Sequence, residues 1–200
     1  MKKILLMCFL ILSFNAVSFA SILDPDEKPT PYIKTVGIFL DAPMSYVDNE
    51  TVRTLIPEKA KELFPRLKFD LLPFDKTEMA LRTYREDHRM IVNQYFSQPL
   101  NRNDIQAIGK DLSCDYALFI KISNGPPRVS SGLLSTTFKT TVICDVRLLD
   151  IATGNYIISK QIVKDGKSTA IYAGVPSFDK AYNEALEKTL KELTIDTSTL

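Results

Sequence analysis

The sequence predicts an α/β (α+β) protein built on a mixed sheet of about five strands, with helices mainly on one face. Three observations carry this prediction. Apolar runs of strand character open the domain and fill most of its carboxyl-terminal half, and amphipathic helical repeats lie between and after them. The stretch "DVRLLDIATGNYIISKQIV" (145–163) has the pattern of two strands joined by a turn. The predicted order is β-α-β-α-α-β-β-β-α.

The 200-residue chain divides into four predicted parts. They are a signal peptide (1–20), a flexible leader (21–33), a single α/β domain (34–193) and a polar tail (194–200). The first part begins with Lys2 and Lys3, continues with an apolar run and ends with the small residue Ala20, which is typical of a secretory signal. We therefore expect cleavage after Ala20, a periplasmic or secreted location, and no stable membrane anchor after cleavage.

The charge of the chain is close to balanced, with 25 lysines and arginines against 24 aspartates and glutamates. Loss of Lys2 and Lys3 with the signal would leave 23 against 24. No basic excess or basic amphipathic helix is evident, so the sequence predicts neither a nucleic-acid partner nor a membrane-surface helix.

Elements of the amino-terminal half follow from periodicity. Residues 34–42 alternate as a strand, and residues 49–64 form an apolar helical stripe that Pro57 either kinks or restarts. Residues 66–72 alternate again, which would point Leu67, Phe69 and Leu71 inward. Next come a helix over 79–96 capped by Thr77 and a shorter helix capped by Asn101 or Asn103.

The carboxyl-terminal half is predicted as strands 116–122, 136–150 and 155–166, followed by a helix over 177–193. In the middle strand, Val142, Cys144, Val146 and Leu148 share the core face. Gly154 supplies the positive φ of the turn between the last two strands.

Cys114 and Cys144 remain after signal cleavage, and an exported chain meets an oxidising compartment. If Ile122 lies opposite Thr136 in an antiparallel pair, Cys114 and Cys144 also lie opposite each other. That register makes a disulfide feasible. A pair of buried free thiols remains the alternative.

Catalytic and metal-binding motifs are missing from the sequence, which contains one histidine and no tryptophan. No cofactor, metal or catalytic residue is predicted. His88 shares its helical face with Tyr84, Arg85, Ile91 and Val92, so no carboxylate is placed to orient it. A packing histidine is the preferred interpretation, and a hydrolase that uses His88 with an unassigned nucleophile is the alternative.

The 13-residue stretch "SNGPPRVSSGLLS" (123–135) is predicted as a long loop. It is either a partner-binding loop, with Arg128, Leu133 and Leu134 as candidate contacts, or an ordinary mobile excursion. On the neighbouring strand, Ile143, Asp145 and Arg147 face away from the core in a mixture typical of a moderate protein interface.

Two segments resemble a known family. "IQAIGKDLSCDYALFIKIS" (105–123) and "TTVICDVRLLDIATGNYIISKQ" (140–161) resemble consecutive segments of a periplasmic α/β family. That family includes the amino-terminal domain of TolB, the curli-secretion lipoprotein CsgG and the penicillin-binding-protein activator LpoB. Gly109, Asp115, Asp150 and Gly154 match its structural positions. The resemblance implies envelope localisation, protein–protein contact and usually no catalysis, although this chain has no lipidated cysteine at the end of its signal.

The sequence thus favours an exported, non-enzymatic envelope protein that acts as a protein-binding or assembly module. Its partner would be another envelope protein, and self-association stays open. A small-ligand carrier is a further alternative, which would require a pocket.

Overall fold

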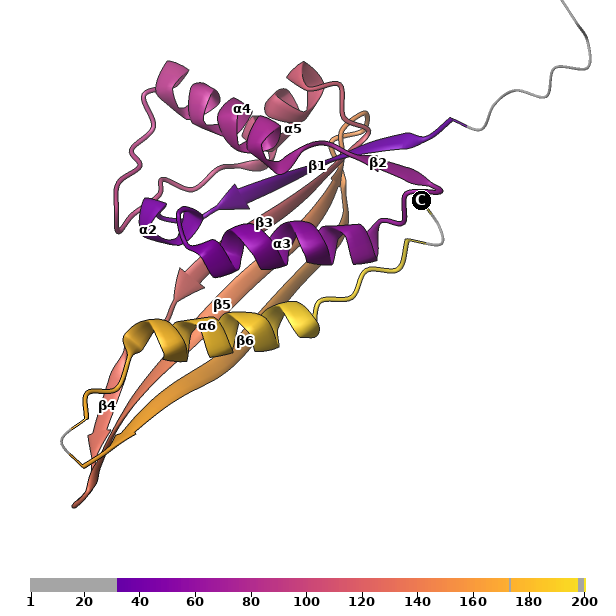
Figure 1. Cartoon of the computed structure of the whole chain (residues 1–200). Helices are drawn as coiled ribbons and strands as arrows, with labels where there is room; N and C mark the ends of the chain where they lie inside the picture. Colours follow the sequence, from indigo (N-terminus) through magenta and orange to yellow (C-terminus); the bar gives the residue numbers. More distant parts are fainter. Residues whose placement is uncertain (1–31, 173, 198–199) are drawn as a thin grey trace, which may run out of the picture. The chain divides into compact units, whose positions relative to one another are not determined.

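The structure is a computed structural model that describes residues 32–172, 174–197 and 200 (Figure 1). It separates into two units, Met1–Tyr32 and Ile33–Leu200, and the second contains every helix and strand described below. The predicted signal peptide and all but the end of the predicted leader lie outside the described residues.

One six-stranded mixed sheet forms the centre of the second unit, so the predicted fold class is confirmed. Its order is β2 (Phe69–Leu71), β1 (Lys34–Asp41), β3 (Tyr116–Asn124) and β5 (Ser135–Asp150), with both β4 (Arg128–Ser131) and β6 (Tyr156–Ile171) paired to β5. Strand β1 runs parallel to β2 and β3, whereas all pairings of β5 are antiparallel.

The helices are α2 (Met44–Val47), α3 (Glu50–Leu63), α4 (Phe74–Asp87), α5 (Arg102–Asp111) and α6 (Phe178–Lys191). Helices α3 and α6 cover one face of the sheet, over Ile38 and Cys144. Helices α4 and α5 cover the other face at β1 and β3, over Phe39 and Phe119, so the prediction of helices mainly on one face was wrong. Strands β1 and β3 are apolar on both faces, so both faces of this part of the sheet need a cover.

Local signals placed two helices correctly. The side chain of Asn49 accepts hydrogen bonds from the first turn of α3, and the helix continues through Pro57. Asn101 and Asp104 form a reciprocal capping box at the start of α5.

The prediction for α4 was wrong at both ends. The helix begins at Phe74, after Pro73, and Thr77 lies inside it with its hydroxyl donating to the Phe74 carbonyl. It ends at Asp87, because Arg89 adopts a left-handed φ of 53°. Residues 88–100 are irregular, and Ile91 and Tyr95, which the helical pattern placed on the apolar stripe, are exposed.

Strand β2 is shorter than predicted. A turn in which the amides of Lys68 and Phe69 both donate to the Pro65 carbonyl delays its start. Phe69 is buried as expected, but Leu67 lies in the turn and is 95 % exposed.

The β5–β6 hairpin confirms the predicted turn, where Gly154 has a φ of 70°, and the predicted core face of β5 from Val142 to Leu148. Two features differ from the sequence prediction. Strand β6 continues to Ile171, five residues past its predicted end, and the predicted loop 123–135 contains strand β4.

The register predicted for β3 and β5 was wrong, because Ile122 lies opposite Cys144 and not Thr136. Strand β3 pairs with the later part of β5, residues 142–150, because β4 pairs with its first part, residues 136–139. Both cysteines are free and buried. Cys114 packs with Phe39 on the α4–α5 face of the sheet, whereas Cys144 packs on the α3–α6 face. Cys114 and Cys144 therefore form no disulfide in the structure.

The four residues that carry the family resemblance have structural roles. A β-carbon at Gly109 would lie 2.4 Å from the Ile151 side chain. Asp115 Oδ2 accepts from the Thr35 amide at 2.8 Å, and Asp150 Oδ1 accepts from the Thr153 amide at 2.9 Å. These residues, with Gly154, fix where α5 and the hairpin turn meet the sheet.

Candidate partner-binding surface

Strands β4, β5 and β6 continue as a three-stranded extension beyond β3 (Figure 1). We call this part the distal ribbon and define it as residues 128–141 and 165–172. It ends in a tight turn, where the Gly132 amide donates to the Ser135 carbonyl at 2.7 Å, and the Tyr172 amide donates to the Leu134 carbonyl at 2.7 Å. The backbone at the tip is therefore hydrogen-bonded, which positions the side chains that it presents.

Large apolar side chains are exposed at this tip. Leu133 is 99 % exposed and Tyr172 is 78 % exposed, and both project from the hydrogen-bonded turn region. The exposed apolar residues of the tip and its surroundings are Val129, Leu133, Leu134, Ile171, Tyr172 and Val175. Apolar side chains gathered at one place on a soluble domain mark an interaction site more often than single exposed residues do.

A row of cations crosses the distal ribbon. Arg128 of β4 lies opposite Lys139 of β5, which in turn lies opposite Lys167 of β6. Within the part of the chain that the structure describes, none of the three forms an ion pair within 4.0 Å. Like charges on directly opposite residues destabilise a sheet, so the row is costly for folding alone.

Two carboxylates lie near this row, and neither forms an ion pair with it in the described part of the chain. Asp165 Oδ1 accepts from the Thr141 hydroxyl at 2.6 Å. Glu184 of α6 accepts from Lys188 Nζ at 2.6 Å and from the Lys167 amide at 2.9 Å. The hydrogen bond from Lys188, followed by that from Lys167, lowers the pKa of Glu184.

The remaining predicted contacts lie farther along the face of β5 that points away from α6. Ile143 is opposite Val163, and the two form an apolar pair between polar rows. Asp145 Oδ1 accepts from Gln161 Nε2 at 2.7 Å, and the Arg147 guanidinium lies 5.4 Å from the centre of the Tyr156 ring. These contacts hold the side chains in place on the strand surface.

The structure thus places the six predicted contact residues on two connected regions. Arg128, Leu133 and Leu134 belong to the distal ribbon and its tip, and Ile143, Asp145 and Arg147 line the adjoining outer face. Sequence reasoning missed five residues there: Lys139, Lys167, Ile171, Tyr172 and Val175. The β-branched residues and alternation of "KSTAI" after Gly166 were the signal that could have extended β6.

His88 follows the last residue of α4 and its side chain is exposed. The prediction that this histidine packs against the protein was therefore wrong about its burial. Its Nδ1 lies 2.8 Å from the Tyr84 carbonyl oxygen, and its ring stacks on the Tyr84 ring at 3.9 Å between centres. Tyr84 in turn donates its hydroxyl to Asp104 Oδ1 at 2.9 Å. Within the described residues, no carboxylate or nucleophile is hydrogen-bonded to the imidazole.

No group of three or more histidine, cysteine, aspartate or glutamate side chains among the described residues could hold a metal ion. No helix there has both the length and the apolar character that a membrane span needs.

No protein-family model matches the sequence, and no curated protein matches it. Solved structures with a similar fold include hypothetical protein CT253 from Chlamydia trachomatis, at 12 % identity and a TM-score of 0.40 over 80 % of this chain and 93 % of that chain. Lipoprotein GNA1162 from Neisseria meningitidis has 15 % identity and a TM-score of 0.37 over 79 % and 95 %. The LpoB C-terminal domain from Escherichia coli has 12 % identity and a TM-score of 0.33 over 68 % and 85 %. Similarity at this level establishes no family membership.

Proposed function

We propose that this chain is an exported, non-enzymatic protein of the bacterial envelope that binds another envelope protein through its distal ribbon. The apolar tip is the observation that carries the proposal. Leu133 and Leu134 are exposed on a turn whose backbone is hydrogen-bonded on both sides. Because the backbone of the turn is already hydrogen-bonded, a partner that covers these side chains need not order the backbone, which favours binding.

The cation row indicates the chemistry of the partner. Arg128, Lys139 and Lys167 repel one another in the free protein, and an acidic partner would relieve that repulsion. The partner surface would therefore combine an apolar patch, placed over the tip, with acidic side chains beside it. Export is supported by the basic start, apolar run and small residues of the first 20 positions.

Crosslinking in intact cells tests this proposal. A photoreactive residue at Ser131, on the exposed strand β4, would capture whatever lies on the ribbon, and mass spectrometry would identify it. We expect one envelope protein to dominate the products. The change Leu133→Ser with Leu134→Ser should reduce that product about tenfold or more, since two apolar anchors are lost.

Leu67→Ser is the control, because Leu67 is about as exposed as Leu133 but lies before β2, away from the ribbon. It should leave the product unchanged. Equal crosslinking in the tip variant and the control would refute the tip as the binding site. A product that contains only a second copy of this chain would replace the proposed partner by a homo-oligomer.

A further inference from the structure

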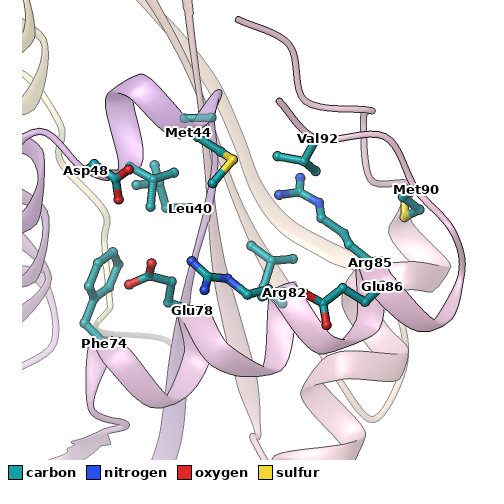
Figure 2. A pocket seen from close by; sticks show the side chains of 13 residues that line it. Leu40, Met44, Asp48, Phe74, Glu78, Arg82, Arg85, Glu86, Met90 and Val92 are labelled. Atoms are coloured by element: carbon teal, nitrogen blue, oxygen red, sulfur yellow. The ribbon is translucent and has the colours of Figure 1, made fainter. Parts of the chain in front are cut away.

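A separate cavity of about 300 Å³ lies between β1, α2 and α4 (Figure 2). Its apolar walls come from Leu40, Met44, Phe74, Leu81 and Val92. The volume lies at the lower end of the range for small-molecule pockets. The distal ribbon contributes none of the lining residues, so this cavity is independent of the proposed partner surface.

The segments that follow β1 and β2 border this cavity. After β1 the chain passes to α3, which covers one face of the sheet, and after β2 it passes to α4, which covers the other face. The two strands are parallel neighbours, so their connections diverge from the same end of the sheet. Crevices at the carboxyl ends of strands whose connections diverge are the common ligand sites of open α/β sheets.

A buried arginine with unused donors lines the cavity. The side chain of Arg85 is only 8 % exposed, and its Nη2 donates to Asp41 Oδ1 at 2.5 Å. Its Nε has no hydrogen-bond partner, and neither has Asp41 Oδ2. A guanidinium has five N–H donors, and a buried donor without a partner costs free energy. Among the described residues, the guanidinium therefore keeps an unpaired buried donor, Nε, beside the cavity.

A second arginine lies beside the first. Arg82 lines the same cavity and forms no ion pair within 4.0 Å in the described part of the chain. Figure 2 shows the side chains of Arg82 and Arg85 extending from α4 into the space that Leu40 and Val92 border.

Three acids also line the cavity. Glu78 is bound by Arg53 Nη1 at 3.1 Å, whereas Asp48 and Glu86 are exposed to solvent at the rim. Water and salt screen charges at an exposed rim far more than at a buried wall. Asp41 balances the charge of Arg85, so the positive charge available to a ligand is that of Arg82, while Arg85 contributes hydrogen-bond donors.

We propose that this cavity binds a small carboxylate with an apolar body. The carboxylate would accept hydrogen bonds from the free donors of Arg85, with Arg82 at the entrance, and the apolar body would lie against Leu40, Phe74 and Val92. A planar carboxylate matches the two parallel donors of a guanidinium. An amide oxygen accepts from these donors more weakly than a charged carboxylate oxygen does, and an ammonium offers no acceptor at all.

Titration of the isotope-labelled domain with three probes of one length tests the proposal. Hexanoate, hexanamide and hexylamine differ only in the head group. We expect hexanoate to shift the amide resonances of Leu40, Leu81 and Val92 and to saturate them at millimolar concentration, as a ligand of this size allows. Hexanamide and hexylamine should each bind about tenfold more weakly or not at all.

Variants identify the site. Val92→Trp should fill the cavity, and Arg85→Met should remove the buried donors, so each should abolish the hexanoate shifts. Lys76→Gln removes one exposed positive charge from the same helix outside the cavity and should leave hexanoate binding unchanged. If Arg85→Met fails to fold, Val92→Trp and the comparison of head groups still decide the matter.

Three outcomes would overturn the proposal: equal binding of hexanoate and hexanamide, tighter binding of hexylamine, or no response to hexanoate. Unchanged hexanoate binding in Val92→Trp would do the same. None of these results bears on the crosslinking at the distal ribbon, so the two proposals stand or fall separately.

Discussion

Gly166 of β6 lies directly against the backbone of Ala181 in α6. A β-carbon at position 166 would lie 1.8 Å from the Ala181 carbonyl oxygen and 2.7 Å from the Ala185 amide nitrogen. Both atoms belong to the helix backbone, which cannot move aside as a flexible side chain would. The glycine therefore sets how closely α6 approaches the long hairpin, at the point where the distal ribbon begins.

Gly166→Ala should destabilise the domain by about 3 kcal/mol, the upper end of the usual cost of overpacking, because α6 must withdraw from the sheet. Urea denaturation followed by circular dichroism would measure the change. Gly132→Ala is the matched control, since its β-carbon would lie 3.4 Å from the Ser135 hydroxyl oxygen, near ordinary contact distance, and should cost little. Equal stability of the two variants would contradict the close contact.

Gly166 also shows what the sequence could not reveal. A glycine inside a strand pattern indicates a strand end, a bulge or the close approach of another backbone. Only the position of α6 shows which of these three applies to Gly166. The predicted strand accordingly stopped at Gly166, and Lys167 and the apolar residues beyond it were missed. Local signals were more dependable, as the Asn101 capping box and the Gly154 turn show.

Long-range choices account for the other errors. The register between β3 and β5 depends on β4, which the sequence presented as a loop. Apolar spacing continued through Ile91 and Tyr95 as if α4 did, but the chain turns at Arg89 and leaves both exposed. The core face of β5 was predictable because alternation is fixed within a strand, whatever its partner.

Asp41 and Arg85 form a buried pair, and Ser97 adds a hydrogen bond to Asp41 Oδ1 at 2.7 Å. Asp41→Asn should lower the free energy of unfolding by about 3 kcal/mol, because it leaves the buried guanidinium without a counter-charge. Urea denaturation measures this, with Asp48→Asn as a control at the exposed rim of the same cavity. A loss confined to a few tenths of a kcal/mol would show that the pair is solvated.

Both thiols should resist alkylation in the folded protein. Burial, as the main cause, raises the pKa of Cys114 to about 11 and that of Cys144 to about 12. At pH 8 the thiolate, which is the reactive form, is then present on the order of one part in a thousand or less. Mass spectrometry after iodoacetamide treatment should find both residues unmodified without denaturant and both modified in urea. Rapid labelling of Cys144 without denaturant would contradict its burial.

The raised pKa of Cys144 also makes stability depend on pH. Its pKa is about 12 in the folded state and 9.0 for an unperturbed thiol, so the unfolded state releases its proton first as pH rises. The contribution is fully present below pH 9.0 and is lost as pH rises toward 12. Between pH 8 and pH 10 the wild type should lose about 1.4 kcal/mol more than Cys144→Ala does. Parallel stability curves for the two proteins would show that the thiol ionises equally in both states.

The cation row should oppose folding while it serves binding. Lys139→Gln removes the central charge between Arg128 and Lys167, so it should raise the free energy of unfolding by about 0.5 kcal/mol at low salt, and by less at high salt.

The same change should weaken crosslinking to the envelope partner at Ser131, since an acidic partner loses its central contact. Lys61→Gln, on α3 and far from the ribbon, should alter neither measurement. Thermal unfolding at two salt concentrations, together with the crosslinking yield, checks both effects in one pair of variants. A variant that is more stable but crosslinks as well as the wild type would separate the cation row from binding and leave the apolar tip as the sole contact.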